Sequence, residues 1–125
     1  MTWTRTASVI PMGAPRMTRR DRWKRRPIVL RYFAFRDALR AECAGHPIDP
    51  HEVSWVAYMQ FPNSYTKARR ERLRGQPHQT KPDRDNIDKA VLDTLFPDDS
   101  RVSDGHLRKV WDDGNGPRIE ITMEY

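Results

Sequence analysis

The segment Glu52–Phe61 (EVSWVAYMQF) places Val53, Trp55, Ala57 and Met59 at every second position. This spacing predicts a β-strand with one buried face. A sheet with one buried face must be covered on that face by another layer of structure. Only 37% of the 125 residues are hydrophobic, which suffices for one modest core and not for two. We therefore expect one domain that spans residues 1–125.

The remaining sequence supplies helices to cover that face and further strands to widen the sheet. A helix is predicted where apolar residues recur at helical spacing, and a strand where they alternate. Together the elements predict an α+β domain with a roughly four-stranded mixed sheet covered by helices. The expected strands are 2–10, 52–61, 102–111 and 118–125, and the expected helices are 28–44, 64–74 (Ser64 as N-cap, Gly75 as its end) and 85–95.

The last two expected strands are joined by residues 112–117 (DDGNGP). Asp-Gly followed by Asn-Gly is a strong hairpin signal. We therefore expect these two strands to pair directly with each other.

Several classes of protein are excluded by what the sequence lacks. No apolar run approaches the ~18 residues of a membrane span, so we expect no membrane partner. We also find no secretory leader. Cys43 is the single cysteine, which excludes an intrachain disulfide and makes a cysteine-based zinc site very improbable. These features predict a protein of the reducing cytoplasm.

The distribution of charge indicates the partner. The chain carries 23 Lys and Arg against 17 Asp and Glu, a net charge of +6 that is typical of nucleic-acid-binding proteins. Residues 1–31 have a net charge of +8 and residues 64–81 of +5, whereas residues 82–104 have −4. An acidic segment would repel a phosphate backbone unless a divalent cation reversed its local charge.

The acidic segment provides the candidate chemistry. Asp83 precedes the helix 85–95, Asp85 begins it, and Asp98-Asp99 follow on a turn that can fold back beside them. Three converging carboxylates would form an all-oxygen site for Mg²⁺, with Mn²⁺ as a substitute. Such a site supports phosphodiester hydrolysis. Lys89, four residues after Asp85 on the same helical face, would offset charge on the phosphate.

Simpler interpretations of the same residues stay open at this point. Asp83 or Asp85 would serve equally well as an N-cap, and Asp98-Asp99 as a turn. Asp85 and Lys89 would also form an ordinary surface ion pair. His78 is expected in a loop. Trp23 is interpreted as a core anchor, with base stacking as the alternative.

The basic segments are the predicted DNA contacts. The loop 16–26 and the helix 67–74 carry most of the cations, so phosphate contacts should dominate the affinity. A solvated helix face is the alternative for the second segment. The predicted DNA-binding residues are Arg16, Arg19, Arg20, Lys24, Lys67, Arg69, Arg70 and Lys81.

The residues 81–93 resemble a known signature. Lys81–Ala90 (KPDRDNIDKA) followed by Asp93 is similar to the KPDxDNxxKAxxD motif of the RusA family of Holliday-junction resolvases. Asp98–Asp104 (DDSRVSD) with Lys109 resembles the second block of that family, although Phe96-Pro97 makes the preceding connection shorter than in most members. The basic segment 64–74 and the stretch 15–18 are also similar to family features. The close resemblance covers roughly residues 62–111.

The resemblance implies a homodimeric, Mg²⁺-dependent endonuclease that nicks two opposing strands of a four-way DNA junction symmetrically, in recombination and repair. It implies metal-ligand roles for Asp83, Asp85 and Asp99 and a catalytic role for Lys89. Asn86 and Asp98 would support these residues without binding the ion. The expected setting is the cytoplasm of a bacterial cell, with a phage as one possible source of the gene.

Two other function classes are compatible with the composition. The first is a non-catalytic basic DNA-binding module, in which the acids are caps and ion pairs. The second is a metal-dependent nuclease for flaps or RNA. The acidic segment argues against the module, because pure phosphate binding has no use for it. Only the resemblance separates a junction resolvase from the other nucleases.

Overall fold

The computed structural model describes residues 1–22 and 25–125, so the predictions for Trp23 and Lys24 fall outside the described residues. The expected α+β domain with a four-stranded mixed sheet is confirmed. The elements in chain order are β1 (Thr2–Ala7), the 3-10 helix η1 (Arg19–Arg22), α1 (Pro27–Glu42), β2 (Glu52–Met59), α2 (Lys67–Leu73), α3 (Arg84–Leu95), β3 (Leu107–Trp111) and β4 (Arg118–Glu124).

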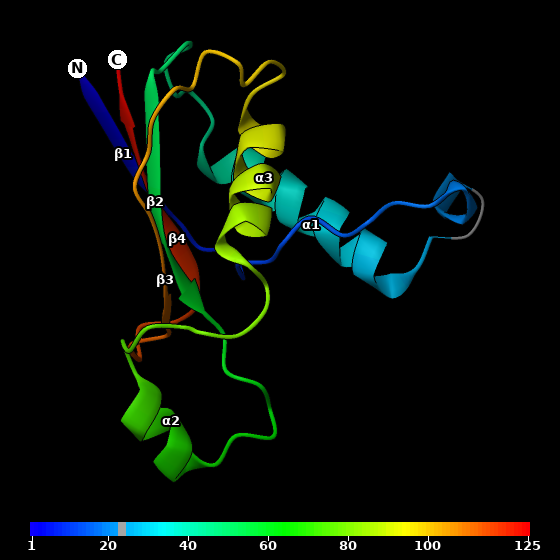
Figure 1. The fold of residues 1–125 in the computed structure, drawn as a ribbon, viewed down its shortest axis with the longest axis vertical. Helices are drawn as coiled ribbons and strands as arrows, with labels where there is room; N and C mark the ends of the chain where they lie inside the picture. Colours follow the sequence, from blue (N-terminus) through cyan, green and yellow to red (C-terminus); the bar gives the residue numbers. More distant parts are fainter. Residues whose placement is uncertain (23–24) are drawn as a thin grey trace.

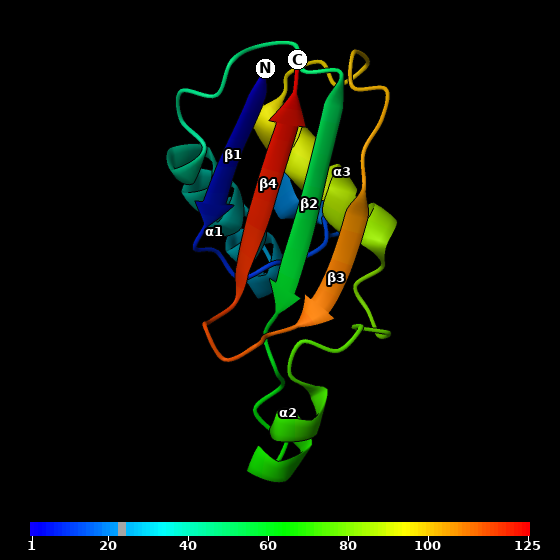
Figure 2. The same cartoon turned by 90° about the vertical axis from the view of Figure 1, so that its left-hand side faces the viewer.

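The strand order is β1-β4-β2-β3, with β4 antiparallel to both of its neighbours and β3 parallel to β2 (Figure 2). The predicted hairpin between the last two strands is therefore wrong. Residues 112–117 do form tight local turns, in which Asp112 Oδ1 accepts hydrogen bonds from the backbone N–H groups of Gly114 and Gly116. The loop nevertheless crosses the end of β2 before it reaches β4, because β4 is a central strand that pairs with β1 along one edge and with β2 along the other.

One face of the sheet is buried against α1 and α3 (Figure 1). The alternating residues of β2 that the sequence predicted to be internal are all buried. They meet the apolar stripes of the two helices in one core. Its main members are Ala7, Tyr32, Phe35, Leu39, Cys43, Val53, Trp55, Ala57, Met59, Ile87, Val91, Leu95, Ile119, Ile121 and Met123. The opposite face is free of helices and carries polar residues such as Thr4, Glu120 and Thr122 (Figure 2).

Several element boundaries differ from the sequence prediction, and β1 and β2 end at Ala7 and Met59, before the expected residues 10 and 61. The strand expected from residue 102 begins only at Leu107, because residues 102–106 bond to β2 at isolated points, such as Val53 N–H to Asp104 O at 3.1 Å. The basic helix is capped by Thr66 and not by Ser64. The Thr66 hydroxyl accepts the Arg69 N–H at 3.2 Å, whereas residues 62–65 form a turn of their own.

Two basic segments project from the rest of the fold. The segment that carries α2 extends beyond the end of the sheet, and the loop before α1 extends sideways, while both termini lie at the opposite end of the sheet from α2 (Figures 1 and 2). None of the helices in the described residues is long and apolar enough to cross a membrane.

Candidate active site

The route of the chain into α3 is fixed by the outer edge of β3. Residues 75–78 run along this edge and form three backbone hydrogen bonds with it. They are Gly75 N–H to Trp111 O at 3.1 Å, Trp111 N–H to Gln76 O at 2.9 Å, and His78 N–H to Lys109 O at 3.1 Å. The polypeptide that leads to Asp83 is therefore attached to the sheet before the helix begins.

Lys109 continues this attachment with its side chain. Its half-buried Nζ donates to the carbonyl oxygen of Pro82 at 2.7 Å and to that of Thr80. Burial lowers the pKa of Lys109, and the nearby charge of Asp83 opposes that shift. The ammonium group thus holds the two peptide units that lie directly before the candidate carboxylates.

The loop after β1 supports the other side of the α3 entrance. Ala14 N–H approaches Asn86 O at 3.4 Å, and a Cβ added at Gly13 would collide with the Asn86 side chain and lie 3.1 Å from Pro82 Cβ. A larger residue at this position would force the Asn86 side chain to move. Asn86, predicted to have a supporting role, therefore contacts the basic loop of residues 11–26.

Asp83 occupies the N-cap position of α3, but its side chain makes no capping hydrogen bond. Asp85 lies within the first turn of the helix. Both carboxylates line an open cavity of about 520 Å³ together with His78, Leu107 and Lys109. Asp83 is therefore the N-cap residue by position, but its side chain does not cap the helix, and its carboxylate remains available for a ligand.

Asp88 lies on the sheet side of α3 and is a site residue that the sequence analysis did not identify. Its Oδ1 accepts the Trp55 indole N–H at 2.9 Å. Burial raises the pKa of Asp88, the Trp55 hydrogen bond opposes this shift, and the charges of Asp85 and Asp99 add to it. Its spacing of three residues from Asp85 places it on a nearby helical face, and this was the available signal.

The two residues of the Asp98-Asp99 turn have different surroundings. Asp98 Oδ1 accepts the Ser100 N–H at 3.0 Å, which lowers the pKa of Asp98, and the residue borders the groove between α1 and α3. Asp99 is exposed, and its charge contributes to raising the pKa of Asp88. The turn interpretation thus describes Asp98, whereas Asp99 does not line the cavity that contains Asp83 and Asp85.

Lys89 does not line the cavity that contains Asp85. It lines the groove between α1 and α3, and no ion pair joins it to Asp85 within the described residues. The surface ion-pair interpretation is therefore wrong.

No set of three carboxylate, histidine or cysteine side chains lies close enough to hold a metal ion within residues 1–22 and 25–125. The donors nevertheless have the right chemistry, since Asp83, Asp85 and Asp99 offer only hard oxygen atoms of the kind that Mg²⁺ prefers. The uncapped carboxylate of Asp83 is consistent with such an ion.

The predicted DNA-binding residues divide into exposed and inward-turned side chains. Arg16, Arg19 and Arg20 are exposed on the loop before α1, and Lys67, Arg69 and Lys81 are exposed on and after α2. Arg70 is turned inward, because its guanidinium donates to Tyr65 O at 3.2 Å and to Pro62 O at 3.1 Å. Arg70 therefore braces the segment that presents the other cations.

An aromatic cluster joins that segment to the sheet. The rings of Phe61 and Trp111 stack at 5.1 Å between centroids, and the ring of His78 lies 4.4 Å from that of Trp111. His78 is in a loop, as expected, but it is only 6% exposed and its Nδ1 has no partner among the described residues. Burial, with Lys109 adding to the effect, lowers the pKa of His78 to about 4.

Taken together, the helix-covered sheet, the carboxylates at the start of α3 and the two basic projections define an α+β protein with an acidic site suited to nucleic-acid chemistry. The sequence matches the family described as endodeoxyribonuclease RusA over residues 8–124, and the chain belongs to this family. The family comprises endonucleases of branched DNA junctions. No curated protein matches the chain significantly.

The hydrogen bonds of Lys109 lead to a first prediction. We expect Lys109→Met to accelerate amide hydrogen exchange across residues 80–85 and to lower DNA cleavage by ~10–100-fold, as loss of a supporting contact does. Lys109→Arg should keep much of the exchange protection and of the cleavage activity, since arginine is also a charged donor. Arg31→Met, an equal charge change at an exposed position of α1, is the matched control. Exchange and cleavage unchanged in Lys109→Met would contradict the positioning role.

The buried His78 leads to a second prediction, on stability. The pKa of His78 is 6.5 in the unfolded chain and about 4 in the folded protein. The free energy of unfolding should therefore fall as the pH drops from about 6.5 to 4, by on the order of 2 kcal/mol from this residue. Urea titrations should show this component in the wild type and not in His78→Gln. Equal pH slopes in the two proteins would refute it.

Proposed function

We propose that this chain is a Mg²⁺-dependent endodeoxyribonuclease that resolves four-way DNA junctions by paired symmetric nicks, in recombination and repair. The observation that carries the proposal is the pair of carboxylates, Asp83 and Asp85, that line one cavity beside the sheet edge. Neither is used to cap α3 by a side-chain hydrogen bond. Arg84, Arg108 and Lys109 line the same cavity, but no ion pair to either acid forms within the described residues. In a basic, DNA-directed protein, acids left without an ion pair serve hydrolysis better than binding.

Asp83, Asp85 and Asp99 are the residues that would hold Mg²⁺, and Mn²⁺ should substitute for it. When bound, the ion would supply a water of lowered pKa and stabilise charge on the leaving oxygen. Lys89, one helical turn after Asp85, would offset charge on the scissile phosphate from the α1 side. Asp88, held by Trp55, would contribute negative charge beside the ligands.

Exposed cations would hold the DNA around this site. Arg16, Arg19 and Arg20 on one projection and Lys67 and Arg69 on the other would bind phosphates, with Lys81 between them. Arg69 lies over the Tyr65 ring, with its guanidinium carbon 3.7 Å from the ring centroid, which fixes its direction.

Two symmetric nicks require two sites. A junction has equivalent opposing strands, and a homodimer with a two-fold axis would place one acidic site at each of them. The basic segments of both copies would then form one continuous DNA-binding surface.

The test of the proposed function is the conversion of Asp85 to an amide. We expect Asp85→Asn to abolish cleavage of a labelled four-way junction while binding is kept or tightened, because the change removes an anionic ligand and a repulsive charge. Wild-type cleavage should require Mg²⁺ and stop with chelator. Asp37→Asn, an equal charge change on an exposed position of α1, is the control. An Asp85→Asn protein that cuts at the wild-type rate would overturn the assignment of the active site. A wild-type protein that cleaves flaps or RNA in preference to four-way junctions would overturn the assignment of the substrate.

The second test separates Asp98 from Asp99. Asp99→Asn should lose several orders of magnitude in cleavage rate, since it removes a metal ligand. Asp98→Asn should lose ~10–100-fold or less, since it removes the turn bond to Ser100. Calorimetric titration with Mn²⁺ should show weakened binding in the first variant alone. The reverse ranking would assign the metal to Asp98.

A further inference from the structure

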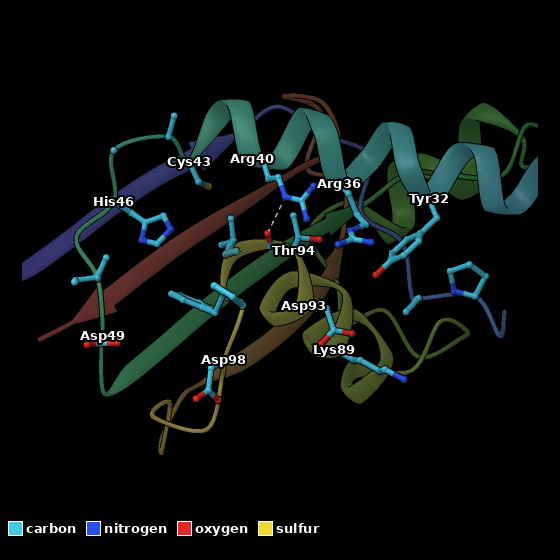
Figure 3. Close-up of a pocket in the computed structure, with 18 of the residues that line it drawn as sticks. Tyr32, Arg36, Arg40, Cys43, His46, Asp49, Lys89, Asp93, Thr94 and Asp98 are labelled. Atoms are coloured by element: carbon cyan, nitrogen blue, oxygen red, sulfur yellow. Dashed lines mark hydrogen bonds between the residues drawn. The ribbon is translucent and has the colours of Figure 1, made fainter. Parts of the chain in front are cut away.

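A groove of about 1050 Å³ runs between α1 and α3, on the side of α3 away from Asp83 and Asp85. Tyr32, Arg36 and Arg40 extend from α1 toward α3 across this groove (Figure 3). Lys89 and Asp93 border it from the α3 side. No DNA-binding residue predicted from the sequence lines this groove.

Arg36 is the feature of the groove that lacks an explanation within the fold. It is half-buried, its Nε is shielded from solvent, and that atom has no hydrogen-bond partner in the described part of the chain. No carboxylate of the described residues lies within ion-pair distance of it, in contrast to the Arg118–Asp113 pair at 3.1 Å. A shielded guanidinium with unmet donors favours an external acceptor.

The neighbours of Arg36 keep its side chain in the groove. Its guanidinium carbon lies 5.7 Å from the centroid of the Tyr32 ring. Arg40 lies one turn further along α1, and its Nε–H donates a hydrogen bond to Thr94 O at 3.1 Å. This bond fixes the direction of the Arg40 guanidinium as well. Two cations at a spacing of four residues are thus presented to the same space.

The charge of the groove is divided along its length. Arg36, Arg40 and Lys89 lie toward one part, where Asp93 is the neighbouring acid (Figure 3). Asp49 and Asp98 lie toward the other end, with His46 (Figure 3). An anionic ligand would therefore occupy the part that contains Lys89.

This cationic part lies one helical turn along α3 from the candidate site. Lys89 follows Asp85 by one helical turn, a rise of ~6 Å. Ala14, Pro15 and Met17 of the basic loop also line the groove. A strand that leaves the carboxylates would pass Lys89 and meet Arg36 next, because successive phosphates of a strand are separated by a similar distance.

We propose that the groove between α1 and α3 binds the phosphodiester backbone of one DNA strand, with Arg36 and Arg40 as phosphate contacts beyond Lys89. This inference rests on the proposed function in that the ligand is DNA. The lining of guanidinium, ammonium and hydroxyl groups matches phosphate oxygens and provides no pattern for reading bases, so the contact is independent of sequence.

The test measures binding alone, in chelator, so that it does not depend on cleavage. The affinity for a four-way junction is measured against salt concentration for the wild type, Arg36→Gln, Arg36→Lys and Arg31→Gln. Each lost phosphate contact lowers the slope of log K against log[salt] by about 0.9. We expect this loss in Arg36→Gln, recovery in Arg36→Lys, and no change in Arg31→Gln, which alters an exposed position on the same helix.

Phosphate ethylation interference locates the contact. One phosphate whose ethylation weakens the wild type should become neutral toward Arg36→Gln, close to the cleavage position. Unchanged slopes and interference in Arg36→Gln would overturn the groove assignment while leaving the proposed function intact. If Arg36→Gln does not fold, the same two measurements are made on Arg40→Gln. A slope lowered by about 0.9 together with one phosphate that becomes neutral to ethylation supports the assignment, and the wild-type slope and interference pattern overturn it. A wild-type protein that binds no DNA would overturn both.

Discussion

The pairing of residues 75–78 with β3 determines where the chemistry of this protein is located. β3 is the edge strand and runs parallel to β2, so the carboxyl ends of both strands lie at one end of the sheet. The chain leaves β2 there, forms α2, returns along β3 and enters α3. Lys109 completes the path by binding two carbonyl groups before Asp83. The cavity with Asp83 and Asp85 consequently lies along the outer edge of β3, beside Leu107, Arg108 and Lys109.

The direction of each side chain around α3 explains the division of the site. Relative to Asp85, Asp88 is rotated by about −60° and Lys89 by about +40°, from the ~100° that each residue turns in an α-helix. Asp88 is thereby directed to the Trp55 indole in the sheet, and Lys89 to α1. The helix therefore presents Asp85 and Lys89 to different cavities, one beside β3 and one beside α1.

Patterns along the chain predicted most of the fold, because they depend on local burial. The alternation in β2 and the apolar stripe of α3 correctly identified buried residues such as Trp55 and Ile87. The hairpin prediction failed, because the segment DDGNGP indicates only that the chain turns. It carries no information about which strand the following strand pairs with. That choice depends on β4, whose two edges pair with β1 and β2, residues more than 50 positions away. The roles of Lys109 and Asp88 were missed for the same reason, since their partners Thr80 and Trp55 are 29 and 33 residues distant.

The candidate carboxylates were identifiable from sequence, but their environment was not. Spacing alone made Asp83 an equally good helix cap, and only the absence of a side-chain hydrogen bond distinguishes the two roles. Burial is the main cause of the raised pKa of Asp88, and repulsion by the charges of Asp85 and Asp99 adds to it. Such repulsion destabilises the folded protein unless a cation or a proton relieves it. Arg84, Arg108 and Lys109 line the same cavity as Asp83 and Asp85, but no ion pair to Asp83, Asp85 or Asp99 forms within the described residues. A site that its own protein leaves electrostatically unbalanced favours a cation from outside, and this is the physical reason to expect metal-dependent chemistry at the start of α3.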